Sequence, residues 1–343
     1  MKSHITVSGG KKSLLWILLL VALFHVAWYA KSRSFQNRSL PDPKVLEDYR
    51  KGMISRMNYP VDIYDAERIR IESSGNSLLL TVRTSNVKNA NTIVFVPGTT
   101  AYSNVYAEYQ HALWKEGYHV VGLDPRGHGE STGLRGDYTI QELTDDTLAA
   151  VEYAKKRFGT KVIVSGSSQG GIVAFYAAAK DDSIAAVVCH NLADLNGKDN
   201  LILTRFSLPA FLVPVADQLM ELYQGYSIPV SSYLDLSREH FKDGTDIATL
   251  IDRDPLAVTW VSLRAMRSLL KTPLQKPVEE IQVPIFLIHA EKDHIFPESY
   301  VREIYSRLRS PKFFYLVPGK EHMIFTNDVS EIVPFISSWL KKI

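Results

Sequence analysis

The segment Gly166-Ser167-Ser168-Gln169-Gly170 has the G-x-S-x-G pattern in which a serine serves as a nucleophile. It follows an apolar run that is predicted to be a strand, Lys161–Gly166, and it opens a run with helical character, GGIVAFYAAAK. A strand that turns tightly into a helix needs small residues around the turn, and the helix N-terminus favours a developing oxyanion. The pentapeptide alone also fits a glycine-rich helix start. The flanking strand and helix therefore favour Ser168 as a nucleophile.

A serine hydroxyl needs a base to remove its proton, and the base needs a carboxylate to orient it. Asp293 follows the predicted strand Ile285–His289, and His322 follows the predicted strand Phe313–Val317. Because parallel strands end at the same edge of a sheet, both side chains are expected beside Ser168. The sequence thus predicts a triad of Ser168, Asp293 and His322. The alternative is that Asp293 caps a loop and that His322 is a surface histidine.

Glu291 and Asp194 are rival candidates for the orienting carboxylate. Glu291 lies closer to the end of its strand than Asp293 does, and Asp194 follows a different predicted strand, Ile184–Cys189. Both are therefore less favoured than Asp293. His294 adjoins Asp293 in the sequence, so its side chain should point elsewhere, and we expect it to line the substrate pocket.

The tetrahedral intermediate of acyl transfer needs two N–H donors. The backbone N–H of Gln169, the residue after the nucleophile, is expected to be one donor. The second is expected from the loop after the predicted strand Thr92–Val96, where Thr99 follows Pro97-Gly98 and is the best candidate. This chemistry needs neither a metal nor an organic cofactor, and the sequence contains no H-E-x-x-H or P-loop motif.

From residue 61 onward, short apolar runs alternate with helical stretches such as Ile140–Phe158 and Val301–Leu308. Two runs, Arg68–Ser73 and Leu78–Arg83, are predicted to form a hairpin. The remaining runs resemble strands that are buried on both faces, so the pattern predicts an α/β fold with a mostly parallel sheet. These buried strands are predicted at Thr92–Val96, His119–Leu123, Lys161–Gly166, Ile184–Cys189, Ile285–His289 and Phe313–Val317.

Residues 192–280 interrupt the alternation because they hold no convincing core strand, and they are too long for a structureless loop. We predict that they form a mostly helical cap inserted between two parts of the core, 61–191 and 281–343. The apolar stretch Phe206–Val215 within the cap has two interpretations. It either forms a funnel for an acyl chain and dips into a membrane, or it packs the cap onto the sheet.

The chain begins with a tail, residues 1–12, and an uncharged apolar segment, Leu14–Ala30. These 17 residues would span about 25 Å as a helix, against a hydrocarbon core of ~30 Å. We predict a single-pass transmembrane anchor over 13–30, with Trp28 and Tyr29 at the membrane interface.

The alternative is a signal peptide cleaved at Ala30-Lys31-Ser32, which would give a secreted protein. Residues 31–60 are polar and are predicted to be a stalk that links the anchor to the core. Lysines and arginines flank the apolar segment on both sides, so they do not decide its orientation.

Composition excludes several classes of function. The chain has 343 residues and a single cysteine, Cys189, which rules out intramolecular disulfides and cysteine-rich metal sites. Its 39 Lys and Arg against 37 Asp and Glu leave a net charge of +2, so nucleic acid is not an expected partner.

The motifs together resemble the α/β-hydrolase superfamily, in its monoacylglycerol-lipase and lysophospholipase-like branch, which is also grouped with the serine aminopeptidase type. Besides the serine motif, the segment Asp124–Ser131 (DPRGHGES) is similar to a turn of this family, and Asp254-Pro255-Leu256 also resembles the branch. The resemblance covers roughly residues 65–343 and implies an α/β-hydrolase fold, with Arg126 and His128 in structural roles. One departure is Pro97-Gly98, where the family often has His-Gly.

The expected function is that of a membrane-anchored serine hydrolase that cleaves carboxylic esters of lipid-like substrates through an acyl-enzyme. Its partners would be a small-molecule ester or lipid and the membrane, while the acyl-chain length and the oligomeric state are not set by the sequence. One alternative is an aminopeptidase-type peptidase, which needs a cap carboxylate such as Glu221 or Asp235 facing Ser168. The other is a non-catalytic binding protein of the same fold.

Overall fold

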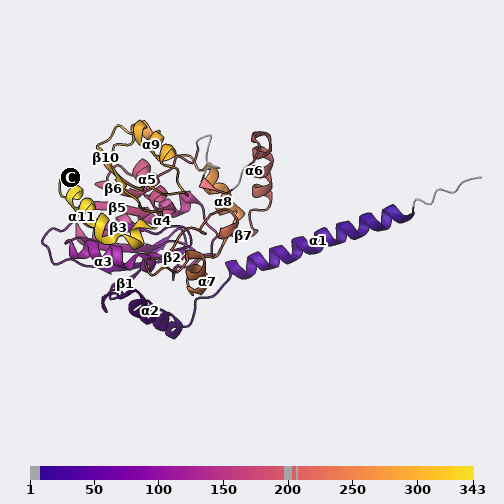
Figure 1. The fold of residues 1–343 in the computed structure, drawn as a ribbon, viewed down its shortest axis with the longest axis horizontal. Helices are drawn as coiled ribbons and strands as arrows, with labels where there is room; N and C mark the ends of the chain where they lie inside the picture. The colour runs from indigo at the N-terminus through magenta and orange to yellow at the C-terminus, as the bar shows by residue number, and fades with distance from the viewer. Residues whose placement is uncertain (1–7, 197–202, 206–207) are drawn as a thin grey trace, which may run out of the picture.

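The computed structural model describes residues 8–196, 203–205 and 208–343. Figure 1 shows a rounded α/β body from which one long helix, α1 (Ser8–Gln36), projects. The body is built around an eight-stranded sheet with the strand order β1-β2-β4-β3-β5-β6-β9-β10. The strands are β1 (Glu67–Ser73), β2 (Asn76–Arg83), β3 (Thr92–Val96), β4 (His119–Asp124), β5 (Val162–Ser167), β6 (Ala186–His190), β9 (Ile285–Ala290) and β10 (Lys312–Val317).

The sheet is mostly parallel, which confirms the fold predicted from the sequence. Strand β2 runs antiparallel to both of its neighbours, and β4, β3, β5, β6, β9 and β10 pair in parallel. The predicted hairpin is present, with Ser73 opposite Asn76 at its turn. Because the central strands are parallel, the segments that follow β3, β5, β6, β9 and β10 all leave at one edge of the sheet.

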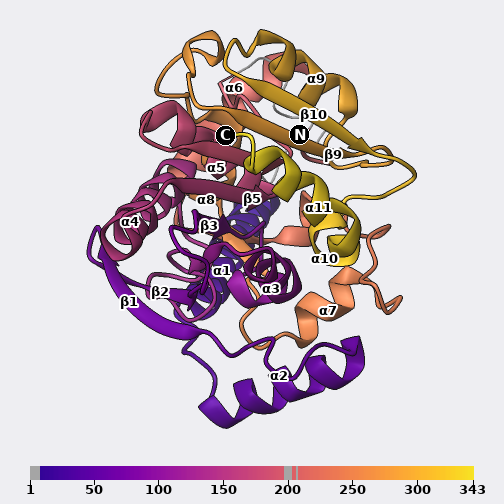
Figure 2. The ribbon, with the colours of Figure 1, turned by 90° about the vertical axis from the view of Figure 1, so that its left-hand side faces the viewer.

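Helices cover both faces of the sheet because the side chains of each buried strand alternate between two apolar cores. On β3, Val94 and Val96 face one core and Ile93 and Phe95 face the other. Figure 2 shows α3 and α11 on one side of the strands and α4 on the other. The helices are α3 (Ala107–Lys115), α4 (Ile140–Phe158), α5 (Gln169–Lys180), α9 (Glu298–Arg307), α10 (Ile324–Asn327) and α11 (Val329–Leu340).

The segment between β6 and β9, predicted as a mostly helical cap, contains both helices and strands. It holds α6 (Val213–Leu222), α7 (Ile247–Arg253) and α8 (Leu263–Lys271), and a small antiparallel sheet of β7 (Ser227–Pro229) and β8 (Trp260–Ser262). Each of these strands has three residues, which is too short to show an alternating pattern in the sequence.

Residues 31–60 differ from the predicted stalk. Helix α1 continues to Gln36, and a second helix, α2 (Pro43–Met57), occupies most of the remaining stretch. Leu46, Met53 and Met57 of α2 are buried, and the two methionines join an apolar cluster with α7 of the cap. This stretch is therefore a packed part of the body, and the stalk prediction is corrected.

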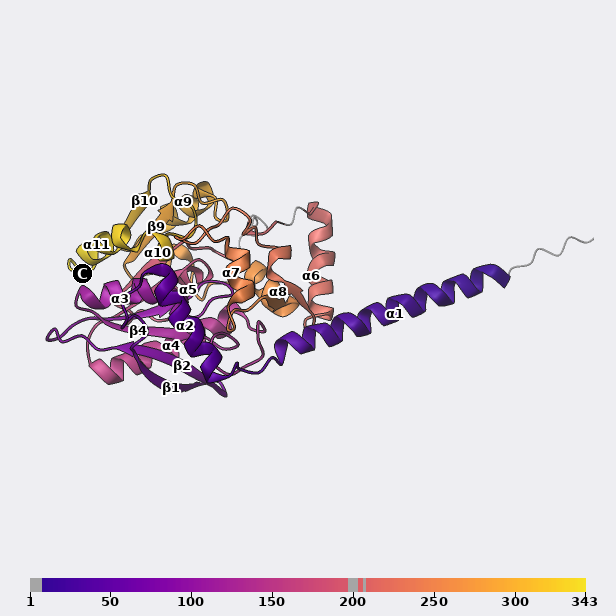
Figure 3. The same cartoon turned by 60° about the horizontal axis from the view of Figure 1, so that its bottom comes forward.

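Within the described residues, one helix is long and apolar enough to cross a membrane, judged by length and composition alone. The candidate span runs over Ser13–Gln36, and its most apolar window of 18 residues has a mean hydropathy of 2.0. A signal sequence near an N-terminus passes the same test, so this finding by itself is weak evidence for an anchor. Figure 3 shows that most of α1 stands away from the body.

Candidate active site

Ser168 lies at the tight turn between β5 and α5, as the sequence predicts. Its backbone has φ 54° and ψ −121°, a strained left-handed conformation for a serine. The glycines of the motif permit the close approach that this turn requires. A Cβ on Gly166 would lie 2.0 Å from the Gly170 carbonyl oxygen, and a Cβ on Gly170 would lie 2.2 Å from the Val96 carbonyl oxygen.

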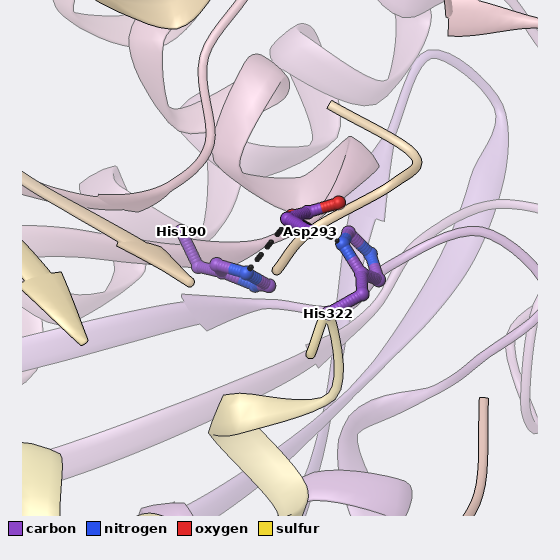
Figure 4. Close-up of side chains that lie close together, drawn as sticks. All are labelled: His190, Asp293 and His322. Carbon is purple, nitrogen blue, oxygen red and sulfur yellow. Dashed lines mark hydrogen bonds and ion pairs between the residues drawn. The ribbon is translucent and has the colours of Figure 1, made fainter. Parts of the chain in front are cut away.

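Asp293 and His322 are brought together at the same edge of the sheet. His322 Nδ1 lies 2.8 Å from Asp293 Oδ2, and both side chains are buried (Figure 4). Asp293 Oδ1 accepts hydrogen bonds from the backbone N–H groups of Ile295 and Phe296, each 2.9 Å long. Since an ionised carboxylate only accepts, Nδ1 of His322 is the donor and Nε2 is left as the basic nitrogen.

The pKa values of Asp293 and His322 are shifted in the directions that suit an ionised carboxylate beside a basic imidazole. Burial alone would raise the pKa of Asp293, but His322 and His190 more than offset this and hold it well below its usual range. For His322 the effects run the other way. Burial would lower its pKa, but the negative charge of Asp293, helped by Glu239, raises it above its usual value. The carboxylate is thus ionised at neutral pH, and protonated His322 is stabilised by its neighbours.

Ser168 and His322 line one pocket whose walls are largely apolar. The empty space of the pocket, counted together with its open mouth, is about 660 Å³. No hydrogen bond joins the Ser168 hydroxyl to His322 in the described residues, and such catalytic contacts commonly tighten only with substrate. The walls are formed by Thr99, Thr100, Ala101, Val105, Tyr106, Leu234, Leu236, Phe241, Ile247, Leu250, Ile251, Asp254, Ala257, Ile295 and Met323.

The predicted oxyanion donors lie in two segments that meet beside Ser168. Thr99 Oγ1 donates to Gln169 Oε1 at 3.3 Å, so the loop after β3 contacts the start of α5. A Cβ on Gly98 would lie 3.3 Å from Ser168 Cβ and 2.9 Å from the Tyr106 hydroxyl, so glycine lets this loop approach the serine. Across the part of the chain that is described, the backbone N–H groups of Thr99 and Gln169 have no acceptor and are free for a ligand.

A buried polar network behind Asp293 was missed by the sequence reasoning. Asn191 Nδ2 donates to Asp293 Oδ2 at 2.9 Å, and Asn191 Oδ1 lies 2.6 Å from His289 Nδ1. His190 lies on the same side, with Nδ1 3.1 Å from Ser167 Oγ and Nε2 3.9 Å from Asp293 Oδ2. The signal that could have found them is two polar residues, His190 and Asn191, directly after an apolar strand.

His190, Asp293 and His322 could also hold a metal ion by spacing, since their donor atoms lie within 4.8 Å of one another. Each oxygen of Asp293 already accepts two hydrogen bonds. A metal bound there would have to displace the contact between His322 and Asp293. The arrangement therefore fits a hydrogen-bonded pair of His322 and Asp293 better than a metal centre.

The rival acids have other partners, and His294 is placed differently from the prediction. Glu291 accepts a hydrogen bond from the Gly319 N–H at 2.7 Å, and Asp194 pairs with Arg307 at 3.2 Å. His294 was expected to line the Ser168 pocket, which is wrong. Its Nε2 lies 3.1 Å from the backbone oxygen of Asp235, so it links the loop after β9 to the cap.

The cap carboxylates proposed for a peptidase do not face Ser168. Glu221 is exposed and pairs with Arg267 at 3.2 Å, and Asp235 is half-buried and accepts from Ser237. A different cap residue, Glu239, is fully buried, with Oε1 3.3 Å from His294 Nδ1. Burial raises the pKa of Glu239, and its oxygens have no hydrogen bond to any described residue. Its polar sequence surroundings gave no sign of this burial.

In the described residues, the apolar cap stretch neither lines the Ser168 pocket nor packs onto the sheet, and the predicted contact with a membrane stays a prediction. Phe206 lies outside the residues that the structure describes. Phe211 is 77% exposed, and its apolar neighbours in this stretch are also exposed and absent from the described wall of the Ser168 pocket. These neighbours are Leu208, Leu212, Val213 and Val215.

The DPRGHGES turn after β4 holds the structure together away from the pocket. Arg126 donates two side-chain hydrogen bonds to the buried Asp146, at 2.9 and 2.6 Å. His128 is buried, with Nδ1 2.9 Å from the Arg126 carbonyl oxygen, and burial lowers its pKa to about 4. These contacts agree with the structural roles that the family resemblance implies for both residues.

The sheet order, the serine at the turn after β5 and the histidine after the last strand define an α/β hydrolase. The chain belongs to the family described as serine aminopeptidase, S33 (Hydrolase_4), whose family model matches residues 87–329. It is accordingly an enzyme of the serine-hydrolase type, in the lipase and esterase branch of the fold.

Curated relatives and solved structures agree with this assignment. The chain is 24% identical over 275 residues to a monoacylglycerol lipase of Mycolicibacterium smegmatis, which covers 78% of this chain and 93% of the relative. It is 27% identical over 250 residues to phospholipase YtpA of Bacillus subtilis, covering 70% and 91% of the two chains. A soluble variant of the monoglyceride lipase of Saccharomyces cerevisiae superposes with a TM-score of 0.65 at 18% identity, covering 81% and 95%.

Proposed function

We propose that this protein is a membrane-anchored serine hydrolase that cleaves carboxylic esters of lipid-like substrates. The proposal rests above all on one observation: Ser168, on a strained turn, shares an apolar pocket with a histidine that is hydrogen-bonded to a buried aspartate. In this proposal Ser168 is the nucleophile, His322 the general base and Asp293 the orienting acid.

The proposed reaction has two steps. Ser168 Oγ attacks the ester carbonyl carbon while His322 Nε2 takes its proton, and the N–H groups of Gln169 and Thr99 stabilise the oxyanion. The intermediate collapses, the ester C–O bond breaks, and His322 gives the proton to the departing alcohol. Water, deprotonated by His322, then attacks the acyl-serine. The bond between the acyl carbon and Ser168 Oγ breaks, His322 returns the proton to Oγ, and the carboxylic acid is released. Asp293 stabilises the imidazolium in both steps.

The pocket supports an apolar acyl group as the substrate moiety. Leu234, Leu236, Phe241, Ile247 and Leu250 of the cap face the pocket that contains Ser168. A hydrocarbon chain loses water on entering such a pocket, which favours binding by roughly 0.8 kcal/mol per buried methylene group. The relatives named as monoacylglycerol lipase and phospholipase support the same substrate class.

A peptidase of the same family remains the second candidate because of the family description. An aminopeptidase needs an acidic group for the substrate amine, and the expected Glu221 and Asp235 are not among the described residues that line the pocket. Asp254 does line the pocket, but its carboxylate accepts hydrogen bonds from Tyr49, Tyr102 and the Leu256 N–H. These contacts favour the esterase over the peptidase.

The contacts of α1 support an uncleaved anchor over a signal peptide. Cleavage after Ser32 would remove both Trp28 and Ser32. Trp28 Nε1 donates to the Ser227 carbonyl oxygen at 2.8 Å, and Ser32 Oγ accepts from the Ser227 N–H at 2.8 Å. Ser32 is fully buried in this contact. A processed chain would lose an interaction that the folded body makes.

The test is hydrolysis of p-nitrophenyl esters from C2 to C16 by the full chain in detergent, with aminoacyl p-nitroanilides assayed in parallel. We expect activity to peak at medium or long acyl chains and to be lost in Ser168→Ala, which should also lose labelling by a fluorophosphonate. Ser306→Ala, an exposed serine on α9, is the matched control and should keep activity. Hydrolysis of the anilides but not the esters would favour the peptidase. A folded protein with neither activity nor labelling would be a binding protein.

A further inference from the structure

The last turns of α1 are fixed to the cap. Trp28 and Ser32 both hydrogen bond to the backbone of Ser227 on β7. One turn further on, Gln36 Nε2 donates to the Ser227 hydroxyl at 3.0 Å and to the Gly225 carbonyl oxygen at 3.1 Å. Ser32 and Gln36 are buried by these contacts. The direction in which α1 leaves the body is therefore set by several hydrogen bonds to one strand of the cap.

A row of exposed apolar side chains lies on the neighbouring helix. Phe211, in the short 3₁₀ turn before α6, and Val215, Leu219 and Leu222 on α6 are here called the α6 stripe; they are 77%, 50%, 50% and 71% exposed. Their spacing of four, four and three residues places them on one side of a helix. Asp217 of α6 instead hydrogen bonds to two basic side chains of α8, so the polar part of α6 is already partnered. An exposed row of this kind marks a contact surface.

The length of α1 places the end of α6 at the edge of a membrane. The uncharged stretch 13–30 spans about 27 Å as a helix, slightly less than the ~30 Å hydrocarbon core. The whole stretch must therefore enter the bilayer for α1 to cross it. Near the end of this stretch, His25 stacks on Tyr223 and Trp28 packs on Tyr226, with ring centroids 5.3 and 4.7 Å apart. Tyr223 directly follows α6.

The direction of α6 fits the same geometry. Figures 1 and 3 both show α6 at the end of the body from which α1 leaves, and both show it running across the direction of α1. A helix that runs across a spanning helix at the level of the interface lies along the membrane surface. Amphipathic helices bind membranes in this orientation, with the apolar side in the boundary between headgroups and acyl chains.

We propose that the α6 stripe is a lipid-binding surface and that the contacts of α1 with Ser227 hold it against the bilayer. The inference rests on the proposed membrane anchoring and adds to it a fixed orientation of the cap. A second copy of the chain could also cover an apolar row, but the anchor brings the bilayer itself to this end of the body. The cap strand that binds α1 would thus set which face of the enzyme meets the lipid.

The test places a fluorophore on the stripe of the full chain in phosphatidylcholine vesicles. Cys189, the natural cysteine, is fully buried, so an introduced cysteine can be labelled selectively with NBD. We expect NBD at Leu219→Cys and Leu222→Cys to be quenched at least twofold by doxyl-labelled lipids and to be protected from iodide. Lys156→Cys on α4, an exposed position away from the cap, should show the reverse. Quenching of the stripe labels by iodide, as at position 156, would overturn the proposal.

Two further variants separate this proposal from the anchoring on which it rests. A label at Leu18→Cys, within α1, reports whether the helix is in the bilayer. Lipid quenching at position 18 together with iodide quenching at 219 and 222 would refute the stripe alone, whereas iodide quenching at 18 would refute the anchor as well. Protection at 219 and 222 from both quenchers would show a second copy on the stripe. The double variant Trp28→Ala, Gln36→Ala should reduce lipid quenching at 219 while the label at 18 stays in lipid.

Discussion

Asn191 offers a sharp test of how the triad is held, because its side chain connects Asp293 to His289. In Asn191→Ala, Asp293 Oδ2 loses a hydrogen bond of 2.9 Å and keeps His322 as its partner. A hydrogen bond to a charged group contributes about 1.5–3 kcal/mol. If Asn191 orients Asp293 for the transition state, its loss should lower kcat by about 10- to 150-fold and leave KM nearly unchanged.

The same substitution should also lower the free energy of unfolding, for two separable reasons. His289 Nδ1, which lies 2.6 Å from Asn191 Oδ1, would be buried without a partner, at a cost of about 1–3 kcal/mol. Asn191 also has a φ of 68°, which costs alanine roughly 1–2 kcal/mol more than glycine. Asn191→Gly removes the hydrogen bonds without the backbone strain. Asn89→Ala, at an exposed asparagine with a φ of 56°, reports the strain alone.

The assay is ester hydrolysis by the full chain in detergent, with unfolding by urea followed in parallel. We expect both Asn191 variants to lose kcat to a similar extent, and Asn191→Gly to be the more stable of the two. Asn89→Ala should lose at most about 1–2 kcal/mol of stability, because asparagine already bears part of this strain, and should keep full activity. A folded Asn191→Gly with kcat within twofold of the wild type would refute the idea that Asn191 positions Asp293.

Three other expectations follow from the contacts described above. Glu239→Gln should move the acid limb of the kcat/KM profile to lower pH, because removing a negative charge near His322 lowers the pKa of that base. An acid limb that stays in place or moves to higher pH would contradict this. Glu221→Gln, at an exposed glutamate, is the control. Arg126→Ala should lower the free energy of unfolding by about 3–5 kcal/mol, since it leaves the buried Asp146 without its ion-pair partner. Urea unfolding measures this loss, and the kcat of the folded fraction should be unchanged. A chain tagged at its N-terminus should keep the tag and stay in membranes at pH 11, and a tag-free form shortened to about residue 33 would show signal-peptide cleavage instead.

The positions of Ser168, Asp293 and His322 could be predicted because each follows an apolar strand of the parallel sheet; the strands before Ser168 and Asp293 are buried, and β10, before His322, is a partly exposed edge strand. Buried strands are conspicuous in a sequence, and their carboxyl ends converge whatever the loops between them do. The helix Ile140–Phe158 was predictable for a similar local reason. Its start carries Thr139 and Glu142, which form a capping box in the structure.

Other features depend on contacts between distant segments and left little trace in the sequence. The buried residues of α2 are diluted by charged neighbours, so the helix was taken for a polar stalk. The direction of His294 depends on where the cap lies, since its partner is the backbone of Asp235. The burial of Glu239 likewise depends on how the cap packs against the loop after β9, where His294 lies 3.3 Å from it. The sequence locates the ends of strands well, but it does not show which side chains of an inserted cap turn inward.

The contact between Tyr49 of α2 and Asp254 of the cap has a consequence for synthesis of the chain. The two residues are 205 positions apart, and the hydrogen bond between them measures 3.1 Å. At ~5–20 residues per second, a ribosome needs about 10 to 40 s to deliver Asp254 after Tyr49. Helix α2 is made early, yet Ile247 and Leu250, which share the apolar cluster of its methionines, are made only when the cap emerges. During that interval the apolar side of α2 is only partly covered, which exposes it to aggregation or proteolysis on the ribosome.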